Sequence, residues 1–374
     1  MDPIALRDLV TVLKRRDSPP EQPGQPIVLV DLEGLEALSP PDANLVAHRL
    51  PDDLRVYVGV RRTPLPVPLI GPGQQILERL TTTVSPRVGP VADGTPQGRV
   101  TATSAVVRVA DPIETAAEIL AQGRRTPDTV HVLDTALRIA ERATARETII
   151  LESNGYTNLL AGPEYTAWRR VFGEVLTGPP AEVRTADDGG RRVVTLDWAT
   201  EASGMDHRLR RVVAEALLAA RSDDVEEIAL RASGPDFCAQ AIPDDDPARR
   251  SDPHAYLTRL SRHVGVAGWL VHRRLTAAVQ GRCSSAGLEL AAFAQSVTAT
   301  PDARFSVPHV RFGLCFGAGG TWSLTRRIGR WRTAYLALSG AEIDAATALR
   351  WGLVDEIVDE AVPQSALAGA VATT

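Results

Sequence analysis

From about residue 190 onward, short apolar runs alternate with longer stretches that have helical spacing. The predicted strands are VVTLDW (193–198), EEIALRAS (226–233), LTAAVQG (275–281) and SVTATP (296–301). Helices are predicted at 207–220, across 255–272 and from about residue 286. Because parallel strands need helix-length crossovers, this alternation predicts an α/β fold with a parallel sheet. Ligands of such folds bind where strands end and helices begin.

The first half of the chain is less regular. Two strand-like runs, IVLVDLEG (27–34) and RVYVGVRR (55–62), are followed by Pro/Gly-rich passages at 63–73 and 85–98. Residues 113–146 and 148–176 have helical spacing, and Gly and Pro residues then interrupt the chain near 178–190. With 374 residues available, we expect a mixed, largely helical N-terminal domain over 1–180, with an α/β start. A second domain is expected over 181–374.

Composition excludes several classes of protein. The net charge of −5 gives no global basic surface for nucleic acid. The opening MDPIALRDLV lacks the basic and apolar segments of a secretory signal, and no apolar run approaches the roughly 20 residues of a membrane span. Cys238, Cys283 and Cys315 are too few and scattered for a disulfide framework or a zinc site. We expect a cytoplasmic protein without nucleic acid, membrane or metal partners.

One carboxylate stands out in the run SSAGLELAAF (284–293). Glu289 is the only charge there, and a buried charge is costly unless it is paired or used. A helix beginning near Ala286 would place that residue's free amide and Glu289 on one face. An amide that holds an oxyanion would then lie beside a proton-transferring carboxylate, which suits chemistry next to a carbonyl group. The apolar neighbours predict a pKa of Glu289 raised toward neutrality.

A second source of amides follows an earlier strand. The segment RASGPDFCAQAIP (231–243) places small residues beyond the predicted strand end, and Ala239 and Ala241 are candidates there.

Residues 275–360 resemble the crotonase (enoyl-CoA hydratase/isomerase) superfamily. The resemblance is carried in order by G-x-E-L (287–290), DARF (302–305), FGL (312–314), GAGGT (317–321) and WGLVDEIV (351–358). DFCAQA (236–241) resembles the first oxyanion segment of that family, and the likeness extends over roughly 190–362. It implies a ββα spiral core and an enzyme that acts on an acyl thioester through an enolate. It also implies no cofactor beyond CoA as the carrier, and assembly into trimers or hexamers.

The resemblance also implies roles for individual residues. Ala241 and Ala286 would be the two amide donors to the thioester carbonyl, and Glu289 would be the first catalytic glutamate. His309, in FSVPHVRFGL, stands where the family has its second glutamate. Ala239 and Gln240 would lie in the segment that contacts CoA.

The chain departs from the family pattern at several places. Gln240 replaces a glycine, Ile242 replaces an aspartate, and SSAG replaces a glycine-rich turn. The sequence stops at Thr374, so the usual C-terminal helices are expected to be missing, and the N-terminal half could substitute for them. A long N-terminal extension before such a core resembles that of dihydroxyphenylacetyl-CoA dioxygenase, a cofactor-free oxygenase.

Structural alternatives exist for each of these features. Glu289 could be a first-turn acid that stabilises its helix, and His309 and Cys315 could be packed core residues. GAGG (317–320) is better interpreted as a tight turn than as a phosphate loop, and PDDDP (243–247) as a solvated loop than as a metal site. His263 could line an acyl pocket or only pack.

Three functions therefore remain open at the level of sequence. The first is hydration, dehydration or double-bond isomerisation of an acyl-CoA or acyl-carrier thioester. The second is cofactor-independent oxygenation or carbon–carbon chemistry on a specialised acyl-CoA. The third is a non-catalytic crotonase-like subunit.

Overall fold

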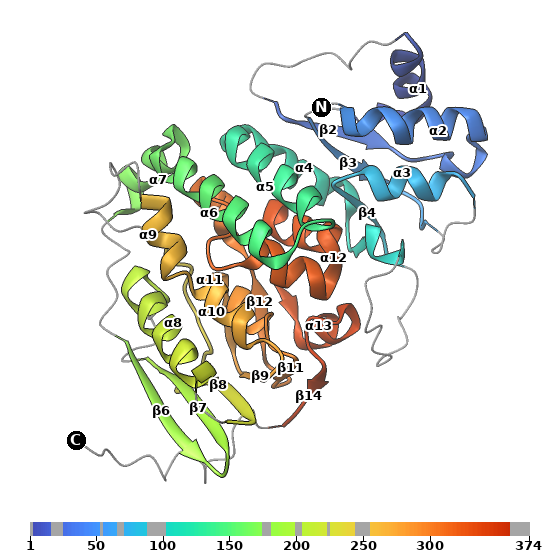
Figure 1. Cartoon of the computed structure of the whole chain (residues 1–374). Coiled ribbons are helices and arrows are strands. Elements are labelled where there is room, and N and C mark those ends of the chain that lie inside the picture. Colours follow the sequence, from blue (N-terminus) through green and yellow to red (C-terminus); the bar gives the residue numbers. More distant parts are fainter. Residues whose placement is uncertain are drawn as a thin grey trace.

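The structure is a computed structural model that describes residues 3–15, 25–52, 55–65, 71–87, 102–173, 181–198, 204–222, 225–243 and 255–359. The N-terminal region lies on one side of the molecule, and the sheets of the C-terminal half lie on the other (Figure 1). No helix within the described ranges is long and apolar enough to cross a membrane.

A five-stranded parallel sheet begins the chain, in the order β1-β2-β3-β4-β5. Its strands are β1 (Ile4–Ala5), β2 (Ile27–Asp31), β3 (Val56–Val60), β4 (Thr82–Pro86) and β5 (Val106–Val109). Alternate residues of β3 face opposite sides, so Tyr57 and Val58 join different apolar clusters. Helices α1 (Leu6–Lys14), α2 (Pro40–Arg49) and α3 (Gly73–Arg79) pack on the Tyr57 side.

This α/β start is larger than the sequence indicated. The strands predicted from 27–34 and 55–62 are confirmed as β2 and β3, whereas β4 and β5 were not predicted. Thr82, Thr83 and Ser85 of β4 are buried polar residues, so the strand lacks the apolar pattern that identifies a core strand. The Pro/Gly-rich passages beside these strands lie partly outside the described residues.

Four helices follow the sheet, as the spacing predicted. They are α4 (Pro112–Arg125), α5 (Pro127–Ala140), α6 (Ala145–Ala161) and α7 (Pro163–Phe172). Asp111 caps α4, and Thr144 with Glu147 forms a capping box that begins α6. The sharp beginning of α6 fixes which of its faces is buried.

The C-terminal half contains a six-stranded sheet in the order β14-β11-β9-β8-β7-β6. These strands are β6 (Glu182–Asp188), β7 (Arg191–Asp197), β8 (Glu227–Ala232), β9 (Leu275–Val279), β11 (Ser296–Ala299) and β14 (Glu356–Ile357). Only the β6–β7 pair is antiparallel among them. A smaller sheet joins β10 (Arg282–Ser284), β12 (Arg304–Ser306) and β13 (Ile343–Asp344).

The helices of this half are α8 (His207–Ser222), α9 (Ala255–Ser261), α10 (Val264–Val271), α11 (Ser285–Ala291), α12 (Gly320–Ser339) and α13 (Ala345–Trp351). The α/β class and the predicted parallel sheet are confirmed. The single helix expected across 255–272 is divided into α9 and α10, because His263 has extended backbone and caps α10.

One hydrophobic core joins the two halves of the chain. Val58 of β3 and Ile149 of α6 belong to the same cluster as Leu290 of α11. Arg330 of α12 is buried, donates to the Leu80 carbonyl at 2.8 Å and lies 2.8 Å from Glu141. The boundary predicted at 180/181 lies at the edge of residues 174–180, which are outside the described part, and it stays a prediction.

Candidate active site

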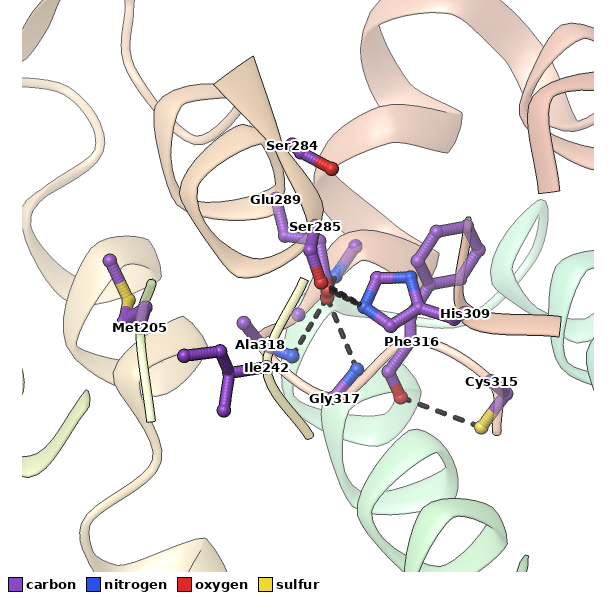
Figure 2. Close-up of polar contacts among 12 residues, drawn as sticks. Met205, Ile242, Ser284, Ser285, Glu289, His309, Cys315, Phe316, Gly317 and Ala318 are labelled. Carbon is purple, nitrogen blue, oxygen red and sulfur yellow. Dashed lines mark hydrogen bonds and ion pairs between the residues drawn. The ribbon is translucent and has the colours of Figure 1, made fainter. Parts of the chain in front are cut away.

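Glu289 lies inside a turn of backbone amides. Its side chain is fully buried, and its Oε2 accepts hydrogen bonds from the amides of Gly317 (3.2 Å), Ala318 (2.7 Å) and Gly320 (2.8 Å). Figure 2 shows the carboxylate between the amides of Gly317 and Ala318 and the imidazole of His309. A Cβ on Gly320 would lie 2.6 Å from the Glu289 Cγ, so only glycine permits this approach. GAGG is therefore a tight turn that binds a carboxylate of the protein itself.

The expected rise in the pKa of Glu289 is wrong. Burial acts to raise this pKa, but the hydrogen bond and charge of His309, the charge of Arg210 and the Ala318 amide together lower it. The sequence showed the apolar neighbours of Glu289 but not the amides of a turn 28 residues further along the chain. The lowered pKa favours the ionised form of Glu289.

His309 is brought to Glu289, as expected if it takes the place of a second catalytic group. It lies in the short helix η6 (Pro308–Phe312) and is buried. Its Nε2 lies 3.1 Å from Glu289 Oε1 and 2.6 Å from the hydroxyl of Ser285. The edge of its ring packs against Phe316 at 5.7 Å between centroids.

Ser285 has a backbone conformation that is unusual for its residue type. Its φ is 55°, and within the described ranges it alone among non-glycine residues has a positive φ. This left-handed conformation costs roughly 1–2 kcal/mol for a residue with a side chain. The position follows β10 and begins α11, where the family pattern has glycine. Sequence reasoning treated this serine only as a small residue and did not identify it as part of the site.

The two segments predicted to supply oxyanion amides lie side by side. The Cys238 amide donates to the Arg282 carbonyl, and the Ser284 amide donates to the Cys238 carbonyl, both at 2.9 Å. A Cβ on Gly287 would lie 2.3 Å from the Cys238 Cβ, so α11 packs directly on the earlier segment. This contact holds the segment of Ala241 beside that of Ala286.

The exposure of the predicted amide and CoA-contacting residues differs. Ala286 is buried, whereas Ala239, Gln240 and Ala241 are half-buried. Gln240 pairs with Gly204 in an isolated bridge, and Ile242 is buried. The structure thus describes both the Ala241 segment and the Ala286 segment. Residues 244–247 of the predicted solvated loop lie outside the described residues.

A second carboxylate, from the N-terminal half, lies in the same turn. Glu152 of α6 is only 1% exposed, and its two oxygens accept from the amides of Gly319 (2.7 Å) and Thr321 (2.9 Å). Burial, and next the charge of Glu289, raise the pKa of Glu152 to about 7. Two carboxylates with opposite shifts therefore share the beginning of α12.

Sequence reasoning missed Glu152, although a signal was present. Buried Ile149, Ser153 and Tyr156 lie three, one and four residues from Glu152, on the core-facing side of α6. A lone acid on an apolar helical face is the signal that singled out Glu289. It was overlooked because no motif in the first half drew attention to it.

Arg210 and His263 lie beside this arrangement. Arg210 of α8 is buried and donates to the carbonyls of Met205 (2.9 Å), Gly317 (3.1 Å) and Ile242 (2.8 Å). It therefore ties the Ala241 segment to the turn that holds Glu289. His263 accepts from the Gly265 amide through Nδ1 at 3.1 Å, and its Nε2 lies 3.9 Å from Glu152.

Cys315 is buried beside this site. Burial, followed by the charges of Glu152 and Glu289, raises the pKa of its thiol well above the usual value. A thiol that stays protonated is a poor nucleophile, which supports the packing interpretation of Cys315. Within the described ranges, no group of three His, Cys, Asp or Glu residues is placed to hold a metal ion.

Known proteins resemble the C-terminal half of the chain. Residues 192–370 match the family described as enoyl-CoA hydratase/isomerase. A probable enoyl-CoA hydratase of Rhodobacter capsulatus is 32% identical over 171 residues, which is 46% of this chain and 66% of that protein. The 1,2-epoxyphenylacetyl-CoA isomerase of Escherichia coli is 30% identical over 179 residues, with 46% and 67% covered.

A fungal hydratase and a solved structure also match the C-terminal half. The mevalonyl-coenzyme A hydratase of Aspergillus fumigatus is 36% identical over 135 residues, which is 35% of this chain and 48% of that protein. The solved structure of an enoyl-CoA hydratase from Thermoplasma volcanium is 29% identical, with 50% of this chain and 73% of that chain covered and a TM-score of 0.41. The chain thus spans about half to two thirds of the length of these curated relatives.

Proposed function

Because the chain belongs to the enoyl-CoA hydratase/isomerase family through its C-terminal half, we propose that it is an enzyme that transforms an acyl thioester through an enolate. Hydration, dehydration or double-bond isomerisation is the proposed chemistry. The acyl group would arrive on CoA or on a carrier protein, and no further cofactor is needed for such proton transfers. The proposal includes assembly as a homotrimer or hexamer.

The observation that carries this proposal is the contact between Glu289 and His309. Glu289 Oε2 is held by three amides, while Oε1 faces His309 Nε2 at 3.1 Å. A fixed carboxylate beside an imidazole can keep the imidazole oriented and stabilise its protonated form. We therefore assign proton transfer to the Glu289–His309 pair, with His309 in place of the glutamate that the family resemblance implies.

The carbonyl of the thioester is assigned to the amides of Ala241 and Ala286. Among the turn and loop contacts of the described residues, no backbone hydrogen bond from either amide is seen. Two amide donors at the carbonyl oxygen would stabilise the negative charge of an enolate more strongly than that of the neutral thioester. Arg210 supports this placement because it holds the Ala241 segment against the Glu289 turn.

The test is turnover of a short panel of enoyl-CoA thioesters, with and without dissolved oxygen. Glu289→Gln keeps the shape of the side chain but removes its charge, so turnover should fall by about 10²- to 10⁴-fold with thioester binding little changed. Turnover of the His309→Gln variant should fall by a comparable factor. Glu215→Gln is the control, because the Glu215 side chain is 62% exposed on α8.

Each outcome separates the candidate functions. Turnover that requires oxygen would replace the proposal with an oxygenase. Thioester binding without turnover of any substrate would favour a non-catalytic subunit. Full activity of Glu289→Gln would leave Glu289 with a structural role only.

A further inference from the structure

Ser285 combines a strained backbone with a close contact to a base. It follows β10 directly, begins α11, and has a φ of 55°. Its Oγ lies 2.6 Å from His309 Nε2, and both side chains are buried. A glycine would remove the strain at this position, so the retained hydroxyl is the feature that requires an explanation.

The His309 imidazole connects this hydroxyl to a carboxylate. The same Nε2 that contacts Ser285 lies 3.1 Å from Glu289 Oε1. His309 Nδ1 has no hydrogen-bond partner in the part of the chain that the structure describes. A hydroxyl, a base and a group that stabilises the protonated base are thus assembled within hydrogen-bond reach.

We propose that Ser285 is a nucleophile that accepts the acyl group of a thioester, so that the protein also catalyses thioester hydrolysis through a seryl ester. This activity goes beyond the enolate chemistry but rests on the proposed function for its class of substrate. The Ala286 amide assigned to the thioester carbonyl belongs to the next residue, so a carbonyl carbon bound there lies beside Ser285.

The reaction has two balanced steps. Ser285 Oγ attacks the carbonyl carbon while its proton passes to His309 Nε2, and the carbon–sulfur bond breaks as that proton is given to the leaving thiolate. The products are the free thiol and an ester on Ser285. Water then attacks the ester with the help of His309, which releases the carboxylic acid and restores the serine hydroxyl. Glu289 stabilises the imidazolium formed in each step.

Neighbouring nucleophiles lack this arrangement. The Ser284 hydroxyl contacts the hydroxyl of Ser306 at 3.1 Å, and within the described residues no hydrogen bond joins it to an imidazole. Burial raises the pKa of the Cys238 thiol to about 11, so it stays protonated. Ser284 is therefore a matched control, because it is adjacent, small and also buried.

The experiment uses the full chain and two measurements. The first is labelling with a fluorophosphonate, followed by intact mass and fragmentation of the tryptic peptide 283–304. The second is release of free CoA thiol from acetyl-CoA and crotonyl-CoA. Wild type and Ser284→Ala should gain one label on Ser285 and release thiol, whereas Ser285→Gly should not be labelled and should lose about 10²-fold or more in thiol release. Glycine suits the φ of this position, so the variant is expected to fold.

Hydration of crotonyl-CoA by the same variants separates the two proposals. Loss of the label and of thiol release in Ser285→Gly, with both kept in Ser284→Ala, supports the nucleophile. Labelling at another residue, no labelling, or unchanged thiol release in Ser285→Gly overturns it, whatever the result for hydration. Loss of hydration in Glu289→Gln, together with unchanged thiol release in Ser285→Gly, leaves the enolate proposal standing without the seryl ester.

Discussion

Replacing Glu152 with glutamine should change how the stability of the protein depends on pH. The pKa of Glu152 is raised from 4.5 to about 7, chiefly by burial. Below pH 4.5 the carboxyl is protonated in both the folded and the unfolded chain. Between pH 4.5 and about 7, the unfolded chain releases the proton and the folded chain keeps it, so the free energy of unfolding falls as pH rises.

The size of this effect follows from the two pKa values. A separation of one pKa unit corresponds to about 1.4 kcal/mol. The interval from 4.5 to about 7 therefore corresponds to roughly 3 kcal/mol of stability lost between pH 4.5 and 8. Glutamine does not titrate, so this contribution should disappear from Glu152→Gln.

Glu152→Gln should also lower the free energy of unfolding by an amount that does not depend on pH, and this amount does not affect the test. Glu152 accepts from two amides through separate oxygens, and the glutamine NH₂ would face one of these donors. An unsatisfied buried donor costs about 1–3 kcal/mol at every pH. The measured quantity is therefore the change in the wild-type-minus-variant difference with pH, which should shift by about 3 kcal/mol in favour of the variant.

Urea unfolding followed by tryptophan fluorescence between pH 5 and pH 8.5 measures this quantity. Glu147→Gln, on the exposed beginning of the same helix, is the charge-matched control. Its capping hydrogen bonds lower the pKa of Glu147, so it should not change the slope in this range. His263 lies 3.9 Å from Glu152, so the comparison is repeated in a His263→Asn background, where asparagine can still accept from the Gly265 amide.

The reasoning about Glu152 is refuted if wild type and Glu152→Gln have parallel stability curves. Parallel curves would mean that Glu152 keeps an ordinary pKa despite its burial. A slope that disappears only in the His263→Asn background would assign the titration to the imidazole.

Two further changes test the site. Ala241→Pro removes one proposed oxyanion donor and should lower turnover by about 10²- to 10³-fold in steady-state kinetics, while unchanged turnover of the folded variant would place the carbonyl elsewhere. Ser285→Gly should be at least as stable as Ser285→Ala in thermal unfolding, because relief of roughly 1–2 kcal/mol of strain exceeds the roughly 0.8 kcal/mol for burying one methyl group. If Ser285→Ala is instead more stable than Ser285→Gly, the positive φ at this position does not lower the stability of the protein.

The C-terminal half could be predicted well because its signals are local. Apolar strands alternate with amphipathic helices, and Glu289 and His309 lie within motifs that can be identified from neighbouring residues. The pKa of Glu289 could not be predicted, because it depends on amides of the 317–320 turn and on Arg210, all distant in the sequence.

The N-terminal contribution was less predictable for a different reason. Strand β4 is short and polar, so its burial depends on the helices that cover it. Glu152 had a local signal, yet its partners are amides 167 and 169 residues away. The positive φ of Ser285 could not be predicted from its residue type, because serine rarely adopts the left-handed conformation that glycine favours.

The packing of α6 against the Glu289 turn constrains how this protein can change over generations. A Cβ on Gly317 would lie 2.5 Å from the ring of Tyr156. A mutation that enlarges this glycine, or that removes the Glu152 carboxylate, therefore requires a compensating mutation in the other half of the gene. The N-terminal half cannot be exchanged by recombination as an independent module. Descendants of this chain should inherit Glu152, Tyr156 and Gly317 together.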